Sequence, residues 1–432
     1  MDDARLDSIV IDALDKGLPP AIGPIAVSDI GKKNIRALSD ELPLPLLLLR
    51  QSAVEHNSAW MKSFLELTGT SLAPHGKTSM SPQLFRRQME DGAWGMTLSN
   101  IHQLKVGRHF GLKRILLANQ LVGRAAIQYV LDELASDPEF EFFCLVDSVA
   151  NVEAVAELAK ERGMTRPVQM LVEGGIVNRR AGCRTIEAAL EVARAVSGNA
   201  PFTALRGVEG FEGIVDNPDP LKRQEDVATF IEFLCEIAKR CEGEGLFAEG
   251  EVILSGGGSA YFDIVASRFG ALDLRQPSRI VLRPGCYLTH DSVMLRNFMA
   301  QMQARRPDLA SLGESWRPAL EVWAHVVSRP QPDHVIVGMG KRDASYDAGL
   351  PVPFASSRPG RDPAPVALEG KYTTVEMNDQ HLFLKVPPDS PLEVGDMLGF
   401  GISHPCLTFD KWRFIPVVNE HYVVVDAITT AF

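Results

Sequence analysis

A lysine stands at the end of a short apolar segment, in the run Ala-Pro-His-Gly-Lys-Thr at residues 73–78. The neighbouring residues Gly76, Thr78 and Ser79 are small and leave room for a ligand beside Lys77. An amine desolvated in such a place is nucleophilic and can hold an aldehyde cofactor as a Schiff base. Most lysines are solvated surface residues, so it is the flanking sequence that favours the catalytic interpretation.

A histidine and a cysteine lie two positions apart in the run Ser-His-Pro-Cys at residues 403–406. In an extended segment the side chains of His404 and Cys406 would project from one face, and Pro405 would stiffen that arrangement. Imidazole and thiolate are preferred zinc ligands, although a bare His-x-Cys also fits a buried structural cysteine beside an ordinary histidine. The sequence has no second His/Cys cluster to complete a four-ligand structural site. A metal here would therefore keep open positions, as catalytic metals do.

Two glycine-containing loops are candidates for binding an anion. They are Ser-Gly-Gly-Gly-Ser at residues 255–259 and Arg-Pro-Gly-Cys-Tyr at residues 283–287. Consecutive glycines let backbone N–H groups converge on one point, and the hydroxyls of Ser259 and Tyr287 are further donors. Three glycines also occur in flexible turns. Both loops, however, follow the last two of eight expected strands, where barrels often bind phosphate.

A group of arginines follows the expected strand 168–173. A guanidinium at this place can face a phenolate or a substrate carboxylate. Arg179, Arg180 and Arg184 cannot all point inward, so a surface cluster is the alternative for most of them. We assign only Arg180 to a site.

Eight short apolar segments alternate with helical patterns between about residues 70 and 290. The expected strands are 71–74, 94–98, 114–117, 141–146, 168–173, 205–209, 251–255 and 279–283. Helical spacing lies between them, for example in 152–162, 185–196 and 224–241. This rhythm predicts an α/β fold, a (β/α)8 barrel of the TIM type, with a doubly wound open sheet as the alternative.

The pattern changes after about residue 300. Five segments there are expected to be strands without long helices between them, and together they predict a β-domain: 317–330, 334–340, 372–375, 382–386 and 422–428. The segment 351–365 is rich in Pro, Ser and Gly and is expected to be a loop. The segment 42–49 precedes the barrel and could pair with the β-domain.

Composition excludes several classes of protein. The chain has 432 residues, of which 45% are hydrophobic and 23% charged, as in ordinary globular proteins. Its net charge of -11 argues against nucleic acid as a partner. The acidic start lacks a signal peptide, no apolar run approaches a membrane span, and the six cysteines are scattered. A cytoplasmic location is therefore expected.

The motifs, in this order and spacing, resemble the D-serine dehydratase and D-threonine aldolase group. Its members share the alanine-racemase-like, fold-type III pyridoxal phosphate fold. The resemblance extends from about residue 42 to the C-terminus. It implies an N-terminal extension (1–41), a pyridoxal phosphate barrel (42–295) and a C-terminal β-domain with the metal motif (296–432). It also implies a homodimer with active sites near the subunit interface.

The resemblance implies roles for individual residues. Lys77 would be the catalytic Schiff-base lysine, and Arg180 would lie near the phenolic oxygen of the cofactor. His404 and Cys406 would bind a divalent metal, with zinc favoured over manganese or cobalt. The cofactor phosphate would be held by the remaining cofactor-binding residues, of which the glycines and the cysteine would use backbone amides: Gly257, Gly258, Ser259, Gly285, Cys286 and Tyr287.

Dehydratases of this group tend to carry His-x-Cys, and aldolases tend to carry aspartate at the second position. Cys406 therefore favours a lyase that dehydrates and deaminates a small D-3-hydroxy amino acid, such as D-serine, to a 2-keto acid and ammonia. The alternative is an aldolase that cleaves D-threonine or 3-hydroxy-D-aspartate to glycine and an aldehyde. A racemase would leave the metal motif without a role. A protein that only stores the cofactor would not need the β-domain, and a cofactor-free sugar-binding barrel would require a solvated Lys77.

One residue departs from the pattern of the group. Phe211 follows the expected strand 205–209, where relatives often present a tyrosine to the cofactor. Its ring can pack but has no hydroxyl, which puts a proton relay at this position and strict D-serine specificity in question. A distal carboxylate of the substrate could be recognised by Arg184, Arg283 or Lys341.

Overall fold

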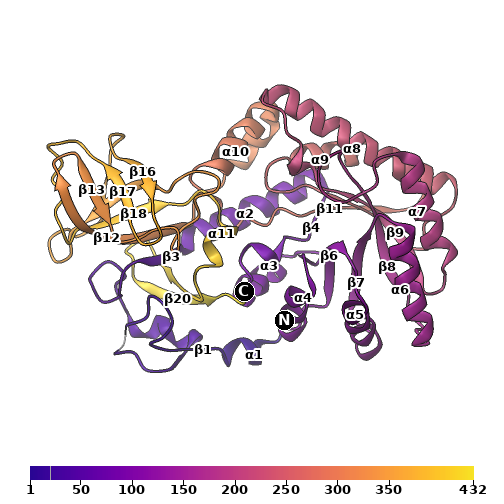
Figure 1. The fold of residues 1–432 in the computed structure, drawn as a ribbon, viewed down its shortest axis with the longest axis horizontal. Helices are drawn as coiled ribbons and strands as arrows, with labels where there is room; N and C mark the ends of the chain where they lie inside the picture. Colours follow the sequence, from indigo (N-terminus) through magenta and orange to yellow (C-terminus); the bar gives the residue numbers. More distant parts are fainter. Residues whose placement is uncertain (20) are drawn as a thin grey trace. The chain divides into compact units, whose positions relative to one another are not determined.

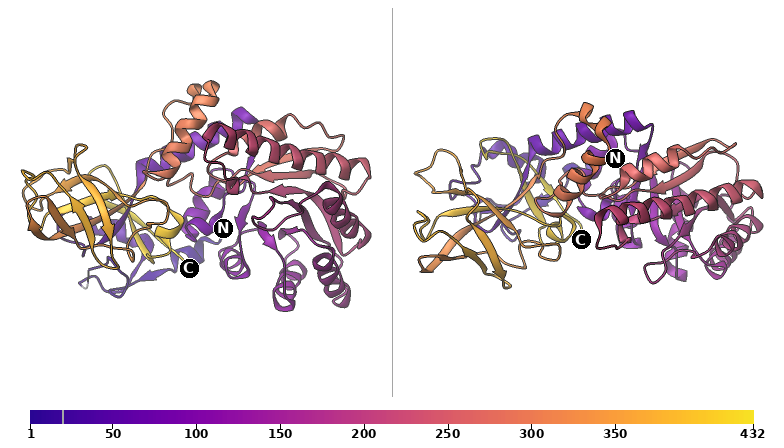
Figure 2. Two further views of the ribbon diagram at one scale, coloured as in Figure 1. Left: turned by 45° about the horizontal axis from the view of Figure 1, so that its top comes forward. Right: turned by 90° about the horizontal axis from the view of Figure 1, so that it is seen from above.

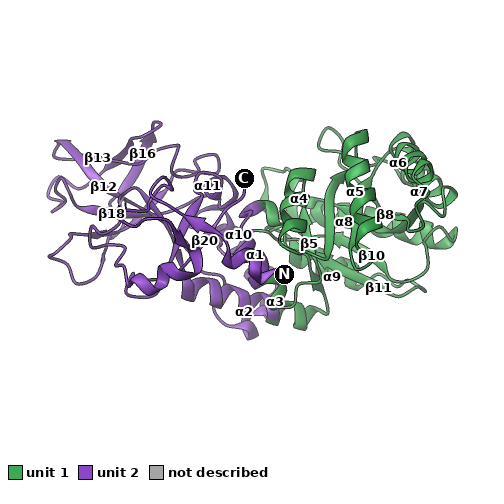
Figure 3. Ribbon diagram, turned by 90° about the horizontal axis from the view of Figure 1, so that it is seen from below, with its two compact units in different colours: residues 1, 63–77, 88–285 green, residues 2–62, 78–87, 286–432 purple. Residues whose placement is uncertain are grey.

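The structure is a computed structural model that describes residues 1–19 and 21–432. It divides into two compact units, which Figure 3 colours separately. The first unit contains residues 63–77 and 88–285 together with Met1. The second contains residues 2–62, 78–87 and 286–432. Both units are thus assembled from segments that are distant in sequence.

Eight parallel strands form the sheet of the first unit, in the order β4-β11-β10-β9-β8-β7-β6-β5. Each lies where the apolar segments predict a strand: β4 (Ser71–Leu72), β5 (Met96–Leu98), β6 (Arg114–Gln120), β7 (Glu141–Val146), β8 (Val168–Gly174), β9 (Thr203–Gly210), β10 (Val252–Gly256) and β11 (Ser278–Leu282). The two ends of this order also meet, because a parallel bridge joins His75 to Thr97. In addition, the N–H of Trp94 donates to the carbonyl oxygen of Leu72 at 2.7 Å. The sheet is therefore closed, which confirms the barrel and excludes the open doubly wound alternative.

Helices connect the barrel strands and lie outside them in all three orientations (Figures 1 and 2). They are α4 (Ile101–His109), α5 (Arg124–Ser136), α6 (Val149–Glu161), α7 (Ile186–Gly198), α8 (Pro220–Gly243) and α9 (Phe262–Gly270). Two further helices, α2 (Gln51–Thr68) and α3 (Pro82–Glu90), contribute residues to both units. The barrel strands bury a cluster of apolar side chains: Ala73, Leu116, Phe143, Leu145, Leu171, Ile253 and Val281. In the part of the chain that the structure describes, no helix is long and apolar enough to cross a membrane.

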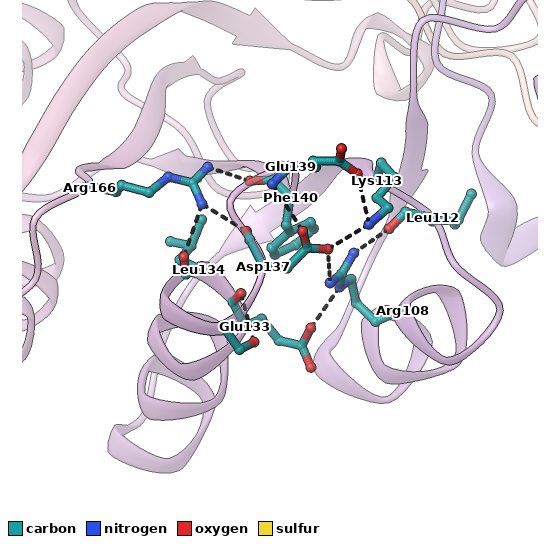
Figure 4. Close-up of polar contacts among 10 residues, drawn as sticks. Arg108, Leu112, Lys113, Glu133, Leu134, Asp137, Glu139, Phe140 and Arg166 are labelled. Atoms are coloured by element: carbon teal, nitrogen blue, oxygen red, sulfur yellow. Dashed lines mark hydrogen bonds and ion pairs between the residues drawn. The ribbon is translucent and has the colours of Figure 1, made fainter. Parts of the chain in front are cut away.

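Charged side chains fix the corner between α4 and α5 (Figure 4). The Nε of Arg108 donates to Glu133 at 2.7 Å and its Nη2 donates to Asp137 at 2.7 Å. The same guanidinium lies 4.1 Å from the ring centroid of Phe140. Lys113 also donates to Asp137, at 2.9 Å. Because the Arg108 side chain is only 10% exposed, this cluster is shielded from solvent more than an ordinary surface ion pair.

A ten-stranded, mainly antiparallel sheet forms the second unit. Its strands are β3 (Leu46–Arg50), β12 (Leu320–Gln331), β13 (His334–Val337), β14 (Val352–Ser357), β15 (Val366–Ala367), β16 (Thr373–Met377), β17 (Leu382–Lys385), β18 (Met397–Gly401), β19 (Phe414–Val418) and β20 (Val424–Thr429). Strand β3 pairs with β12 and β19, so a segment that precedes the barrel completes the C-terminal sheet (Figure 1). The remaining elements are small or peripheral: α1 (Asp3–Asp7), β1 (Val10–Ile11), β2 (Ile25–Ala26), α10 (Met294–Arg305) and α11 (Cys406–Phe409).

The prediction of a loop over 351–365 is wrong, because this segment contains β14, which pairs with β18. The register of that pairing is irregular between Pro353 and Ala355. Proline cannot donate to a sheet ladder, so the irregularity accommodates it in a segment whose composition indicates a loop. Strand β18 was not predicted either, because it is rich in glycine. A Cβ at Gly399 would lie 2.7 Å from the ring of Trp323, so the strand needs glycine where it passes that side chain.

Candidate active site

A cavity of about 400 Å³ lies at the C-terminal ends of the barrel strands. Lys77 lines it from the short turn Gly76–Thr78 that follows β4. Arg180, from the segment after β8, and Gly258, from the segment after β10, line the same cavity. The structure thus brings three of the predicted cofactor-binding residues to one place, in a space large enough for a small organic ligand.

A buried ion pair forms one wall of this cavity. Arg283 contacts Glu209, and their side chains are only 5% and 1% exposed. Burial raises the pKa of Glu209 to about 8, and the charge of Arg283 opposes that shift. The guanidinium of Arg283 is therefore already paired with Glu209 inside the barrel. To bind a distal carboxylate of the substrate as well, it would have to contact both carboxylates at once.

His75 lies two residues before Lys77 and also lines the cavity. Burial lowers the pKa of His75 well below its usual value, and the nearby charges of Lys77 and Arg283 lower it further. The imidazole is therefore neutral at physiological pH, and its Nδ1 is a buried atom without a hydrogen-bond partner in the described structure.

Arg180 and Phe211 face each other, with the guanidinium carbon 5.1 Å from the ring centroid. The other two arginines of the segment are turned elsewhere. Arg179 pairs with Asp216 at 3.2 Å, and Arg184 donates to backbone carbonyl oxygens of its own loop. Of the three arginines, Arg180 is thus the one that lines the cavity.

Phe211 also closes on the glycine-rich loop. A Cβ at Gly258 would lie 2.6 Å from the Phe211 ring, so no larger residue fits there without a rearrangement. The N–H groups of Gly257 and Gly258 donate to the two carboxylate oxygens of Glu212, at 3.0 and 2.7 Å. Glu212 is fully buried, and burial raises its pKa. Two of the N–H groups predicted to bind phosphate therefore already have an acceptor within the protein.

The loop after β11 turns two predicted side chains into the interior of the second unit. Tyr287 is 1% exposed, and its ring centroid lies 6.4 Å from that of Trp316. Cys286 is 7% exposed, and its sulfur atom lies 3.6 Å from the sulfur of Cys406. The remaining predicted donors of these loops are Ser259 and Gly285, and both are half-buried.

The segment around the His-x-Cys motif is not extended, so that prediction is wrong. Pro405 has helical dihedral angles, and Cys406 is the first residue of helix α11. The two side chains are still hydrogen-bond partners, and each has a further contact. The sulfur of Cys406 lies 3.4 Å from the Oγ1 of Thr78, and the Nδ1 of His404 lies 2.7 Å from the Oδ2 of Asp347.

The surroundings of Cys406 favour a thiolate. Hydrogen bonding from Cys286, with smaller contributions from His404 and Thr78, lowers the pKa of Cys406 well below its usual value. Conversely, hydrogen bonding to Cys406 and then to Asp347 raises the pKa of His404 to about 9. Both shifts favour a thiolate beside an imidazolium, and a metal that bound His404 would displace a proton from its ring.

Several of these residues were not predicted to have a role. Glu209, Glu212 and Asp347 act through contacts with residues that are far from them in sequence. For Glu209 one signal was present, because it ends a predicted barrel strand and such positions face the active site of barrel enzymes. Asp347 lies in the connection between β13 and β14, where nothing in the sequence indicates its contact with His404.

Comparisons with known proteins find one family model and several relatives whose sequences are similar to this chain. A family model described as "putative serine dehydratase domain" matches residues 319–418. The 3-hydroxy-D-aspartate aldolase of Paracoccus denitrificans is 26% identical over 380 residues, which cover 86% of this chain and 88% of that protein. The D-threonine aldolase of an Arthrobacter species is 23% identical over 389 residues, which cover 88% of this chain and 90% of that protein.

Solved structures agree with this fold. D-threonine aldolase from Filomicrobium marinum aligns with a TM-score of 0.70 at 23% identity, over 90% of this chain and 95% of that one. D-threo-3-hydroxyaspartate dehydratase from Delftia sp. HT23 aligns with a TM-score of 0.70 at 19% identity, over 90% and 98%. An alanine racemase from Clostridium difficile aligns with a lower TM-score of 0.56 at 13% identity, over 90% and 99%. The chain has the fold of the alanine-racemase-like, fold-type III pyridoxal phosphate family.

Two further structures of the dehydratase named in this family carry substitutions. One has a histidine replaced by alanine. The other has a cysteine, two positions further along, replaced by alanine and is described as the metal-free form.

The cavity residues of this chain fit the cofactor of the family. Lys77 supplies an amine for the aldehyde. The cavity wall also contains three buried polar atoms that have no partner in the described structure, namely His75 Nδ1, Glu209 Oε2 and Arg283 Nε. Such atoms are rare in folded proteins, and a polar aromatic ligand could satisfy them.

Proposed function

We propose that this protein is a pyridoxal phosphate-dependent lyase that acts on a D-3-hydroxy amino acid. The observation that carries this proposal is the position of Lys77 at the barrel cavity, which the buried pair of Glu209 and Arg283 also lines. The names of the aligned relatives support the substrate class. As the family resemblance implies, we expect a homodimer.

In this proposal each side chain has a defined task. Lys77 would hold the cofactor and, once the substrate has displaced it, would move a proton at Cα with its Nζ. When bound, pyridoxal phosphate supplies an electron sink for the electron pair left at Cα. Arg180 would orient the phenolic edge of the ring, and Phe211 would exclude water beside it. Ser259 and its loop would hold the phosphate.

His404 and Cys406 would hold a divalent metal, with zinc favoured by the thiolate. A Lewis acid at this place would polarise the 3-hydroxyl group of the substrate. Two observations support this assignment. Cys406 is surrounded by groups that favour its thiolate, and Thr78, which contacts Cys406, is the residue that follows Lys77 in the chain.

Aldol cleavage to glycine and an aldehyde is the reaction that the relatives favour. Both curated relatives described above are aldolases, and each aligns over most of this chain. This preference differs from the dehydration that Cys406 led us to expect. We therefore propose aldol cleavage as the first reaction to test, with 3-hydroxy-D-aspartate and D-threonine as substrates.

Dehydration to a keto acid and ammonia is the second candidate, because a specific observation favours it. This chain has a histidine and a cysteine with the same spacing as the two residues replaced in the dehydratase structures, one of which is metal-free. A metal serves both reactions, so the metal motif alone does not select between them.

Product analysis tests the proposal. Purified protein would be reconstituted with pyridoxal phosphate and zinc and then incubated with the D- and L-forms of serine, threonine and 3-hydroxyaspartate, with and without a chelator. Glycine and an aldehyde from D-substrates would establish the aldolase. Keto acid and ammonia would establish the dehydratase. Formation of neither would contradict the proposed lyase.

A variant of Lys77 tests the cofactor assignment without relying on turnover. Lys77→Ala is expected to lose the visible absorbance of the lysine-bound cofactor, whereas Lys160→Ala, an exposed lysine on α6, should keep it. Equal absorbance in both variants would contradict the role of Lys77.

A further inference from the structure

The connection between β13 and β14 holds the turn that carries His404. The backbone N–H of His404 donates to the Oγ of Ser345 at 3.0 Å. Ser345 Oγ also lies 3.2 Å from Ser403 Oγ and 3.1 Å from Thr408 Oγ1. All three hydroxyl-bearing residues are buried. This hydroxyl cluster fixes the backbone on both sides of His404 relative to the β13–β14 connection.

The same connection contacts the imidazole ring itself. Asp347 lies two residues beyond Ser345, and its Oδ2 is 2.7 Å from the Nδ1 of His404. The side chains of His404 and Asp347 are 26% and 41% exposed, so the pair lies at the edge of the second unit. A carboxylate accepts hydrogen bonds and does not donate them, so Nδ1 must carry its proton in this contact. The lone pair of a neutral His404 is then confined to Nε2.

We infer that Asp347 is a positioning residue that presents His404 to the metal through Nε2, while Ser345 fixes the backbone of the turn. The inference rests on the proposed metal site. Its physical basis is the contact of a metal-binding histidine with a carboxylate on its other ring nitrogen, which sets the tautomer and the ring orientation and makes the ligand more basic. Asp347 itself would not touch the metal or the substrate.

The inference is tested on zinc affinity rather than on activity. Zinc would be titrated against a chromogenic chelator in the cofactor-loaded protein and in Asp347→Ala, Asp347→Asn and Asp347→Glu. We expect Asp347→Ala to lose about 10- to 100-fold in zinc affinity. Asp347→Asn keeps an acceptor without the charge and should lose less. Asp347→Glu should recover part of the affinity. Asp389→Asn, an exposed aspartate of the same unit, is the matched control and should bind zinc as the wild type does.

A second measurement separates positioning from a merely structural role. The melting temperature of the metal-free Asp347 variants should fall only slightly below that of the metal-free wild type, because the side chain is partly exposed and an exposed ion pair contributes little to stability. The cobalt-substituted Asp347→Ala protein should show a shifted visible spectrum, since His404 would bind in another orientation. Unchanged zinc affinity and an unchanged cobalt spectrum in Asp347→Ala would overturn the inference. An equal loss of affinity in Asp389→Asn would also overturn it.

The zinc titration also distinguishes a failure of the proposed metal site from a failure of the inference about Asp347. If the wild-type protein and a His404→Ala variant bound zinc equally, His404 would not be a ligand and the inference about Asp347 would fall with the metal assignment. Zinc binding that depends on His404 but not on Asp347 would overturn the inference alone.

Discussion

The sulfur atoms of Cys286 and Cys406 lie 3.6 Å apart. The two thiols share Thr78, whose Oγ1 is 3.9 Å from the first sulfur and 3.4 Å from the second. Cys286 is the buried member and Cys406 the partly exposed one. Their contact lowers the pKa of Cys406 and raises that of Cys286. It thus favours the thiolate form of Cys406, which is the form that binds metals and reacts with electrophiles.

The first prediction concerns the reactivity of Cys406. In metal-free protein, Cys286→Ala should raise the pH at which Cys406 reacts with iodoacetamide, because the thiolate loses its main hydrogen bond. Cys286→Ser keeps a donor and should shift the profile less. The alkylation rate at Cys406 would be followed by mass spectrometry. Cys144, whose pKa burial raises to about 12, should stay unreactive and serves as the internal control. If Cys406 showed the same pH profile in the wild type, Cys286→Ala and Cys286→Ser, this account would be contradicted.

The second prediction concerns Glu212. Glu212→Gln replaces one carboxylate oxygen by an NH2 group, so one of the N–H groups of Gly257 and Gly258 loses its acceptor in a buried place. We expect the loop to loosen and the affinity for pyridoxal phosphate, measured by absorbance titration, to fall. Glu249→Gln, an exposed glutamate of the same unit, should leave that affinity unchanged. A rise in affinity in Glu212→Gln would mean instead that Glu212 competes with the phosphate for these N–H groups.

The third prediction concerns the cluster at the corner of α4 and α5. Arg108→Met leaves Glu133 and Asp137 without their shared partner. It should lower the free energy of unfolding by about 1–3 kcal/mol, as expected when a hydrogen bond to charged groups is lost in a shielded place. Arg124→Met removes an exposed ion pair with Glu161 and should cost less than about 0.5 kcal/mol. Urea unfolding of both variants would measure the difference, and equal midpoints would contradict it.

The fourth prediction concerns acid stability. His290 is buried, and burial lowers its pKa from 6.5 to about 4. Between these values the unfolded chain binds a proton that the folded protein does not, so the free energy of unfolding falls as the pH decreases from 6.5 to 4. The full effect is on the order of 3 kcal/mol for this one group.

His290→Asn tests this prediction. Asparagine tolerates the left-handed backbone of this position, where φ is 49°. The variant should show a flatter dependence of stability on pH between 6.5 and 4, measured by urea unfolding at several pH values. His381→Asn, at an exposed position, is the control and should keep the slope of the wild type. A wild-type slope in His290→Asn would show that another group is responsible.

The barrel could be predicted because its strands are buried on both faces and appear in the sequence as short apolar runs. Strand β7 begins and ends where the pattern predicts. Strands β14 and β18 could not be predicted in this way, because proline and glycine occur at positions where only tertiary contacts, such as the ring of Trp323, explain them. Local composition indicates a loop in such segments, and packing overrides it.

The candidate site was predictable to a similar extent. Lys77 and Arg180 follow strand ends, and strand ends converge on one face of a barrel, so their meeting at one cavity follows from the fold. The residues that contact Arg283 and His404 could not be predicted. Glu209, in β9, meets Arg283, which follows β11, with β10 between the two strands. Asp347 meets His404 between two loops of the β-domain. These pairs depend on register and loop path, which periodicity does not specify.

Strand β3 has a consequence for how the chain is made. Residues 46–50 leave the ribosome before the barrel, whereas the strands that flank them, β12 and β19, are among the last segments synthesised. The apolar strand Leu46–Arg50 therefore has neither of its partner strands while residues 63–77 and 88–285 of the first unit are synthesised. A nascent chain stalled after residue 300 would hold a barrel-forming segment and an exposed hydrophobic strand, and it would be a substrate for chaperones until the C-terminal sheet arrives.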